Sequence, residues 1–428
     1  MAGCTSAWSS PDFRRLWTAS TVSSFGSEVA ELALPLLALL TLSASAGEVG
    51  MLRVAQFLPF LLATLPLGVL VDRRRRQRLS LMIGADLGRF VLVATIPIAV
   101  WSGIAEIELL YLVVFAAGIL TVLYQIADFS LLPSLVRPEQ LVDANGKIAA
   151  SQSANEIGGR GLGGMLIQAL TAPVAVAVNA VAFLGSALSL RRIRVEAAEG
   201  ASDESRLPDT PAQSARTEIT EGIMLALRNR YVRALLGEAT TFNVFNEMFI
   251  LGLLVYAVRE LGLSPAAIGL VFTAGGAGSF LGAWFGSRMT RRFGYGRVLL
   301  TSLVLGNSAP LGVLLLGQTG RAAVPVLCTI FVTMGVGIGI ANVHAVSLRQ
   351  LALPDHARGR VNAAYRLISW GAIPAGAAVG GLVAGHAGAE TAMVSGAVGV
   401  ALATLWVAVS AVPRLRSIEG ARSVAAAS

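Results

Sequence analysis

The chain has 428 residues, of which 55% are hydrophobic and only 14% are charged, and its mean hydropathy is +0.70. Soluble proteins carry about 25% charged residues, so this composition excludes an ordinary soluble protein. The formal net charge of +8 comes from 33 basic residues, almost all of them Arg in short segments between apolar runs. Such clustering is typical of the inner loops of a membrane protein and of contact with anionic lipid heads. We therefore expect membrane lipids, and no nucleic acid, as partners.

Twelve apolar runs follow one another along the chain, each long enough to cross ~30 Å of hydrocarbon as a helix. We predict an all-α membrane protein with twelve transmembrane helices. The sixth run is the weakest, because it is short and is interrupted by Asn179. A secretory signal peptide is an alternative reading of the first run, but its apolar part is too long and many spans follow. The runs are residues 17–42, 49–71, 80–101, 108–129, 145–169, 173–190, 231–257, 266–287, 297–317, 323–346, 361–384 and 391–412.

The distribution of Arg and Lys sets the orientation of these spans. If the N-terminus is cytoplasmic, the outer loops carry only Arg259 and Arg321, and the inner segments carry nearly all the other basic residues. Positively charged loops stay on the cytoplasmic side. We therefore predict an integral protein of the bacterial cytoplasmic (inner) membrane with both termini in the cytoplasm.

The longest polar stretch, residues 191–230, lies in the middle of the chain. It opens with a basic cluster, passes through Ala-, Ser-, Asp-, Glu- and Pro-rich sequence, and ends in an amphipathic segment over 218–230. This composition predicts a cytoplasmic linker with a surface helix before the seventh span. The linker separates an N-terminal six-helix bundle, residues 1–190, from a C-terminal six-helix bundle with a short cytoplasmic tail, residues 231–428.

The two sets of six spans repeat each other. Residues 145–164, which run from Asn to Gly-Gly, match 362–381 at an offset of 217, and the pattern over 68–74 matches 286–292 at an offset of 218. Residues that recur at equivalent depths indicate two similar six-helix bundles. Parallel repeats of this kind are typical of transporters whose site lies between the halves, near the midplane of the membrane.

Three motifs resemble a known family. They are Gly68-Val-Leu-Val-Asp72 followed by four Arg, Asp12-Phe-Arg-Arg-Leu-Trp17, and Leu132-Pro-Ser-Leu-Val136. Together with the repeat and the central linker, they resemble the major facilitator superfamily over essentially the whole chain. More narrowly, they resemble its enterobactin-exporter-like transmembrane secretion effectors and macrolide efflux proteins. The resemblance implies alternating access by rocking one bundle against the other, usually driven by protons.

The resemblance has two departures. The family loop usually has Gly inside its basic run, where this chain has four consecutive Arg, so the turn must be made differently. The fifth span of drug/proton antiporters often carries G-P-x-x-G-G, whereas residues 159–164 read G-R-G-L-G-G. The glycines still permit close packing, but Arg160 in place of Pro weakens the antiporter assignment.

The same resemblance implies a gating role for the loop after the second span. Asp72 can face the N-terminus of a helix in the other half, near residues 359–360, where the helix dipole favours an anion. Such a contact would hold the cytoplasmic side closed and would break on opening. The alternative is an ordinary solvated inner loop. The predicted gating residues are Gly68, Asp72, Arg73, Arg76 and Arg78.

Carboxylates inside the spans are candidates for proton coupling or cation contact. Glu28 and Glu31 lie in the first span, and Glu238 and Glu247 lie in the seventh. Ionisable groups at membrane depth are costly and usually face a cavity or a partner. The resemblance implies that these two helices line the central cavity. Glu28, Glu31 and Glu247 could bind a proton on one side and release it on the other, or could be structural partners within the bundle.

Buried Arg residues could neutralise these carboxylates. Glu156 and Arg160 are four apart on one helix face, and Asp86 and Arg89 are three apart, so we expect local pairing of each. Arg53 and Arg366 have no such neighbour. They are expected to neutralise a carboxylate across helices or to bind an anionic group of the substrate.

Polar groups elsewhere complete the candidate cavity. Asp128 lies at the inner end of the fourth span, His344 at the inner end of the tenth, and Asn243 and Asn246 in the seventh. The His titrates in a useful range, although a lone His near a helix end is more often structural. No Walker A or C-x-x-C sequence occurs, so we expect no cofactor, no metal and no enzymatic activity.

The sequence as a whole predicts a secondary transporter. The leading hypothesis is proton-coupled export of a small organic compound, such as a drug or a siderophore-like metabolite. We expect the protein to be a monomer, with protons and this small molecule as its ligands. One alternative is an importer or facilitator of a small anion, with the buried Arg binding it. Another is a lipid-moving or sensor protein on the same scaffold.

Overall fold

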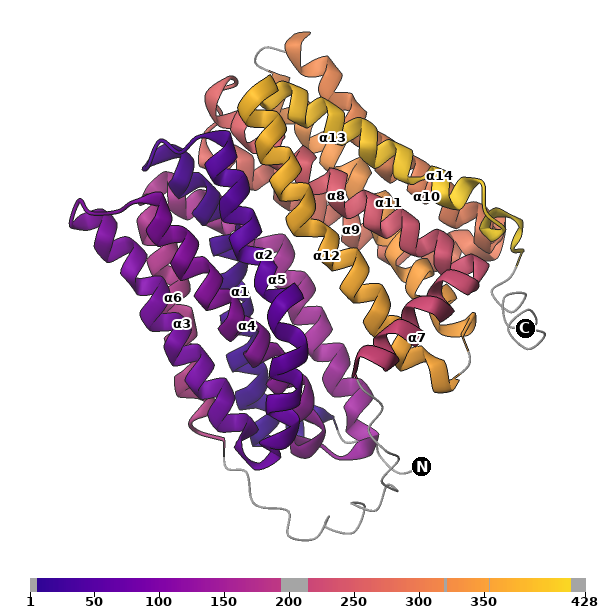
Figure 1. Cartoon of the computed structure of the whole chain (residues 1–428), viewed down its shortest axis with the longest axis horizontal. Coiled ribbons are helices and arrows are strands. Elements are labelled where there is room, and N and C mark those ends of the chain that lie inside the picture. Colours follow the sequence, from indigo (N-terminus) through magenta and orange to yellow (C-terminus); the bar gives the residue numbers. More distant parts are fainter. Residues whose placement is uncertain (1–5, 194–214, 319–321, 354, 417–428) are drawn as a thin grey trace. The chain divides into compact units, whose positions relative to one another are not determined.

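The structure is a computed structural model, and it describes residues 6–193, 215–318, 322–353 and 355–416 (Figure 1). Within these ranges every regular element is a helix. The helices before the linker are α1 (Pro11–Leu40), α2 (Ala46–Arg73), α3 (Arg78–Trp101), α4 (Ile107–Leu135), α5 (Leu141–Ala169) and α6 (Ala172–Leu190). The later helices are α7 (Ala215–Arg228), α8 (Arg230–Arg259), α9 (Pro265–Phe293), α10 (Tyr295–Ser308), α11 (Ala323–Leu351), α12 (Asp355–Ala387), α13 (Ala389–Ala403) and α14 (Leu405–Ala408). Short 3₁₀ helices are η1 (Ala7–Ser9), η2 (Arg75–Gln77), η3 (Pro138–Gln140), η4 (Ala309–Gln318) and η6 (Val412–Arg414).

Side-chain caps decide where several helices begin. The α2 helix starts with a capping box, in which the Glu48 N–H donates to Ser45 Oγ at 3.2 Å and the Ser45 N–H donates to Glu48 Oε2 at 2.6 Å. At the start of α8, the side-chain oxygen of Asn229 accepts hydrogen bonds from the N–H groups of Tyr231 and Val232. Each cap satisfies backbone donors that a helix leaves free at its first turn.

Eleven spans within the described residues are long and apolar enough to cross a membrane, and α10 with η4 and α13 with α14 form two of them. The α5 helix is also long, with 29 residues, but its composition is too polar for it to be counted among the eleven. The predicted helical membrane fold is confirmed, whereas the count of twelve spans is not. The α6 helix, expected to be the weakest span, qualifies with 19 residues.

Contacts between residues divide the chain into two compact units. The first unit is Met1–Ser202 with Leu263–Thr273, and the second unit is Asp203–Gly262 with Ala274–Ser428. The amphipathic segment predicted at the end of the linker forms α7, which packs against α12 in the second unit. Most of the remaining predicted linker, residues 194–214, lies outside the described part of the chain.

The first unit is held together by α1 against α5 and α6, by α2 against α4, and by α3 against α4 and α6. Gly26 brings α1 close to α6, because a Cβ at this position would lie 2.6 Å from the Cβ of Ala182 and 2.9 Å from Oδ1 of Asn179. An apolar core that includes Phe13 and Leu16 joins the helices. The contact with Gly26 means that Asn179, which interrupts the sixth apolar run, packs against a glycine of α1.

The second unit has α8 at its centre, packed against α12 and α13, and α10 packed against α11. Its apolar core includes Tyr231 and Leu235. Gly252 lies where α8 meets α13. A Cβ at Gly252 would lie 2.9 Å from both the carbonyl oxygen of Ala389 and the carbonyl carbon of Ala392. The two helix backbones touch at this point, which leaves no room for a side chain.

Replacing Gly252 by Val should destabilise the second unit, since rigid backbone atoms cannot move aside for the new side chain. Overpacking of this kind costs on the order of 1–3 kcal/mol, so we expect the melting temperature of the purified protein to fall. Gly84→Val is the matched control, because Gly84 is exposed on α3 and an added Cβ there would meet no described atom within 4 Å. Equal melting temperatures for both variants would contradict the close contact of α8 with α13.

The N-terminal segment is held against the start of α5 by Asp143, in a set of contacts that we term the N-terminal clasp. The Ala7 N–H donates to Asp143 Oδ2 at 2.7 Å, and Lys147 forms an ion pair with Oδ1. Lys147 also lies over the ring of Trp8, which stacks edge-on against Trp17 with 4.9 Å between ring centroids. The hydrogen bonds from Lys147 and from the Ala7 N–H hold the pKa of Asp143 below the usual 3.8.

The N-terminal clasp should persist at neutral pH and open only in acid. A carboxylate whose pKa is lowered by folding contributes stability above the pKa of the unfolded chain and loses it as the pH falls through the folded value. We therefore expect release to begin below about pH 3.9, the ordinary pKa of Asp. The readout is tryptophan fluorescence, with Trp8→Phe subtracted to isolate Trp8. Asp143→Asn should give the released signal already at neutral pH, and an unchanged acid step in that variant would contradict the assignment.

Candidate ion-pair site on helix α1

Helix α1 carries two carboxylates, Glu28 and Glu31, three residues apart and therefore on one face of the helix. Glu28 is bound by α5, because Arg160 Nε donates to Glu28 Oε2 at 3.1 Å. The neighbouring Gly159 lets the two helices approach, since a Cβ there would lie 2.5 Å from the Cβ of Glu28. An ion pair thus ties α1 to α5.

Glu31 is bound by α2 instead. Arg53 Nη1 donates to Glu31 Oε1 at 2.5 Å, and Gln56 Nε2 donates to Glu31 Oε2 at 2.6 Å. Arg53 also donates to Gln56 Oε1 at 3.1 Å, and its guanidinium lies over the ring of Phe57, 4.8 Å from the centroid. Both oxygens of Glu31 therefore accept hydrogen bonds from α2, and one of these bonds is charge-assisted.

The two ion pairs are partly accessible. The side-chain exposure is 25% for Glu28 and 30% for Arg160, and it is 22% for Glu31 and 10% for Arg53. A third carboxylate, Glu156 of α5, is exposed and repels Glu28 electrostatically. Three carboxylates and two guanidinium groups leave one uncompensated negative charge when all are ionised. These five residues are the α1 ion-pair site, and only its carboxylates can take up a proton because Arg stays protonated.

The structure changes one predicted pairing. Arg160 was expected to pair with Glu156 four residues before it, and this prediction is wrong, because Arg160 binds Glu28 on α1. The close approach of the helices at Gly159 places Glu28 within reach, while Glu156 is exposed. Arg53 neutralises Glu31 across helices, which is one of its two predicted roles.

The second predicted local pair is confirmed. Asp86 and Arg89 of α3 form an ion pair, and both are buried. The Arg89 guanidinium contacts the rings of both Tyr124 and Phe183, 4.5 and 4.2 Å from their centroids. Asp128 of α4, which was placed in the candidate cavity, is half-buried and accepts a hydrogen bond from the Ser20 hydroxyl at 3.3 Å. It lies in the same unit as the α1 ion-pair site.

The remaining predicted cavity residues belong to the second unit. On α8, Asn243 Nδ2 donates to the Ser369 carbonyl of α12 at 2.6 Å, Asn246 is half-buried, and Glu247 is buried. On α12, Arg366 lies over the ring of Trp370, 4.8 Å from its centroid. Asn243 thus has a partner on α12, whereas Oδ1 of Asn246 is buried without a hydrogen-bond partner among the described residues. The cavity role of these residues stays a prediction.

His344 of α11 is buried and has a partner at each ring nitrogen. Nδ1 lies 2.7 Å from the Ile340 carbonyl oxygen, and Nε2 lies 2.5 Å from the Thr290 hydroxyl. The Tyr295 hydroxyl also donates to the His344 carbonyl. Two satisfied nitrogens are typical of a structural histidine. Among the described residues, no three His, Cys, Asp or Glu gather as metal ligands.

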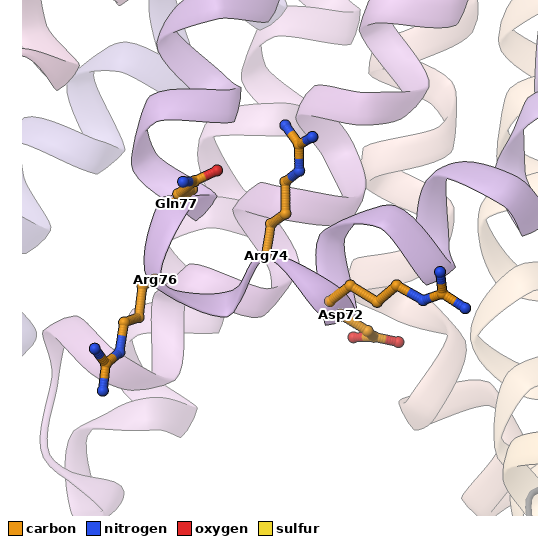
Figure 2. Close-up of a pocket in the computed structure, with 5 residues that line it drawn as sticks. Asp72, Arg74, Arg76 and Gln77 are labelled. Atoms are coloured by element: carbon orange, nitrogen blue, oxygen red, sulfur yellow. The ribbon is translucent and has the colours of Figure 1, made fainter.

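The predicted gating loop is a 3₁₀ turn between α2 and α3. A pocket of about 580 Å³ is lined by Asp72, Arg73, Arg74, Arg76 and Gln77, and Figure 2 shows Arg74 and Arg76 leaving the turn in opposite directions. The turn needs no glycine, because Arg74 ends α2 with φ −110° and its N–H donates to the carbonyls of Leu70 and Val71. This is how the four consecutive Arg replace the usual glycine of the family loop.

Two further residues of this loop have different surroundings. Arg78 Nη1 donates to the Ser130 carbonyl at 2.8 Å, which ties the start of α3 to α4. An added Cβ at Gly68 would meet no described atom of its own bundle within 4 Å. Gly68 is therefore not needed for packing within the first unit, and its gating role stays a prediction together with that of Asp72.

Gln56 binds two members of the α1 ion-pair site but is not among the residues predicted from the sequence. Its amide joins Arg53 to Glu31 by accepting from one and donating to the other. The signal was present in the sequence, since Gln56 follows Arg53 by three residues and so shares its helix face. A polar side chain at that spacing in an apolar run is a candidate partner for a buried charge.

A double-mutant cycle should measure the coupling of Glu28 to Arg160. Arg160→Gln leaves a carboxylate without its cation, whereas the double variant with Glu28→Gln removes both charges. We expect the double variant to melt at a higher temperature than Arg160→Gln alone, with a coupling energy on the order of 0.5–3 kcal/mol. Strictly additive effects in thermal unfolding would show that the two side chains do not interact.

Comparisons with known proteins agree with this architecture. A family model described as transmembrane secretion effector matches residues 2–426. The multidrug efflux pump Tap of Mycolicibacterium fortuitum is 27% identical over 386 residues, covering 88% of this chain and 89% of that protein. The MFS-type transporter YfiS of Bacillus subtilis (strain 168) is 26% identical over 394 residues, covering 88% of both.

Solved structures share the fold at low identity. The nucleoside transporter NupG has a TM-score of 0.69 at 11% identity and covers 97% of this chain and 99% of its own. An inward-facing bacterial homologue of the iron transporter ferroportin has a TM-score of 0.66 at 19% identity and covers 93% and 98%. At these identities the likeness establishes the fold alone. The chain is a membrane transporter that belongs to the transmembrane secretion effector family of the major facilitator superfamily.

Proposed function

We propose that the protein exports a small organic compound in exchange for protons, and that the α1 ion-pair site couples the two movements. The observation that carries this proposal is the pair of carboxylates on α1, each held by an Arg from a different helix. Charges at membrane depth are costly, so two partly exposed ion pairs on one helix face favour a working site over a purely structural one.

Coupling follows from the charge of the site. When its five members are ionised, one negative charge is uncompensated, and either a proton or a cationic compound neutralises it. Binding of one therefore disfavours binding of the other, which is the requirement for exchange. A proton on Glu28 also weakens its bond to Arg160, so that α5 is released from α1 and the bundle can change its packing.

The relatives support the direction and the class of substrate. Tap is named a multidrug efflux pump, and efflux of varied organic compounds agrees with a site that selects by charge. A small-anion facilitator is less well supported, because Arg53 and Arg160 are already bound to carboxylates. The proposal includes a bacterial cytoplasmic membrane location, cytoplasmic termini, a monomeric state and gating by the Asp72 loop.

The test is proton flux in proteoliposomes that hold a preformed pH gradient, with cationic, neutral and anionic organic compounds of similar size. Cationic compounds should collapse the gradient, and Glu28→Gln and Glu31→Gln should each slow this flux by about tenfold or more. A tenfold slower flux corresponds to an increase of about 1.4 kcal/mol in the activation free energy of transport. Thermal unfolding confirms that each variant is folded.

Glu260→Gln is the matched control, because Glu260 is exposed at the end of α8. Unchanged flux in both α1 variants would remove the α1 ion-pair site from the mechanism. Collapse with anions only would favour the anion facilitator instead. Collapse with none of the compounds would favour a sensor or a lipid-moving protein.

A further inference from the structure

A second polar cluster lies inside the second unit, around a carboxylate that is not part of the α1 ion-pair site. Glu238 of α8 is half-buried, and Asn307 of α10 donates to its Oε1 at 3.1 Å. The Asn307 amide also donates to Thr404 Oγ1 at 3.1 Å, and Thr404 directly follows α13. Both Asn307 and Thr404 are buried. The Asn307 amide therefore connects three helices.

The same cluster occurs in the first unit at the offset of 218 that relates the loops at 68–74 and 286–292. Ser20, Arg89 and Ser186 stand at the positions equivalent to Glu238, Asn307 and Thr404. Arg89 is buried in its ion pair with Asp86, and Ser186 lies beside the same carboxylate. Ser20 is hydrogen-bonded to Tyr124, whose ring contacts the Arg89 guanidinium. Both bundles thus place polar groups at the same three helix positions.

The charges in the two clusters differ. In the first unit the carboxylate of Asp86 has the Arg89 guanidinium as its partner. In the second unit Asn307 occupies the equivalent place, so Glu238 receives only a neutral donor. No ion pair joins Glu238 to a cation within the described residues. The carboxyl groups stand at different repeat positions, since Asp86 corresponds to Val304 and Glu238 to Ser20, and only the carboxyl group of the first unit has a positively charged partner.

The other helices around Glu238 do not supply that charge. Tyr365 of α12 interacts electrostatically with Glu238, and its hydroxyl donates to the Leu235 carbonyl at 3.0 Å. Arg349 of α11 lies over the ring of Tyr365, 3.7 Å from its centroid. From α10 and α13 the facing groups are Asn307 and Thr404, which are both neutral. Tyr365 and Arg349 are thus engaged with each other.

We propose that Glu238 is a proton-binding site of the second unit, with Asn307 and Thr404 as the residues that position it. An ionised carboxylate with only neutral partners is costly in a low-dielectric bundle. The neutral acid fits the cluster, because its Oε1 still accepts the Asn307 N–H while the proton resides on the other oxygen. This proposal is independent of the α1 ion-pair site, which lies in the other unit.

The test is infrared spectroscopy of the full-length protein in lipid nanodiscs at neutral pH, in H₂O and in D₂O. A protonated carboxyl group has a C=O stretching band that shifts in D₂O. Glu238→Gln should remove the intensity of one such carboxyl group, and Glu260→Gln, at an exposed residue directly after the same helix, should leave it. Asn307→Ala should shift the band to higher frequency, because Oε1 loses its donor.

A band of unchanged size in folded Glu238→Gln would overturn the proposal. If that variant does not fold, the Asn307→Ala spectrum decides, and an unshifted band there would also overturn it. The infrared measurement does not involve transport. It can therefore contradict the Glu238 proposal without contradicting the proposed antiport. If Glu238→Gln loses the band but still exchanges substrate for protons, Glu238 binds a proton that the proposed antiport does not require.

Discussion

The packing of the first unit depends on the need to neutralise two carboxylates on α1. Glu28 and Glu31 point from one helix face, yet their cations come from α5 and α2. Each ion pair therefore fixes the distance and rotation of a different neighbour of α1. The helices accommodate this through Gly159, where α5 touches the stem of Glu28. Removing one partner of a partly buried pair leaves the other charge uncompensated, which costs more than removing both, so a change of charge at this face changes the packing around it.

The two bundles use one scaffold for different electrostatics. In the first unit, Arg89 contacts two aromatic rings and is paired with Asp86. In the second unit, the equivalent Asn307 divides its amide between Glu238 and Thr404. A fold shared with transporters of nucleosides and homologues of an iron transporter does not itself fix a cargo. Differences of this kind between equivalent positions are where the chemistry of the family can diverge.

Much of the fold could be predicted from the sequence, because a span needs only about twenty apolar residues and lipid leaves helices as the simplest solution. The pairing of charges was harder. The spacing of Glu156 and Arg160 on one helix is visible in the sequence, but the crossing of α1 at Gly159 is not, and this crossing gives Arg160 its partner. The pair of Asp86 with Arg89 was predictable because no other helix is required to form it.

The conformation of the turn after α2 and the packing of α5 could not be predicted from the sequence pattern. Four consecutive Arg showed that the usual glycine turn is absent, but only the backbone of Arg74 shows the 3₁₀ turn that replaces it. The α5 helix has the length of a span, and its polar residues include Asn155, which is buried against α1, as well as exposed side chains. A hydropathy profile averages over a helix, whereas packing depends on which face each residue occupies.

Lys147, the single lysine of the sequence, lies in the N-terminal clasp between Asp143 and the ring of Trp8. Every other side-chain cation is a guanidinium or an imidazole, and neither reacts readily with acylating reagents. A fluorophore or crosslinker directed at primary amines therefore has one side-chain target in the whole chain. Labelling can report on the first turns of α1 and α5 without the removal of any native residue.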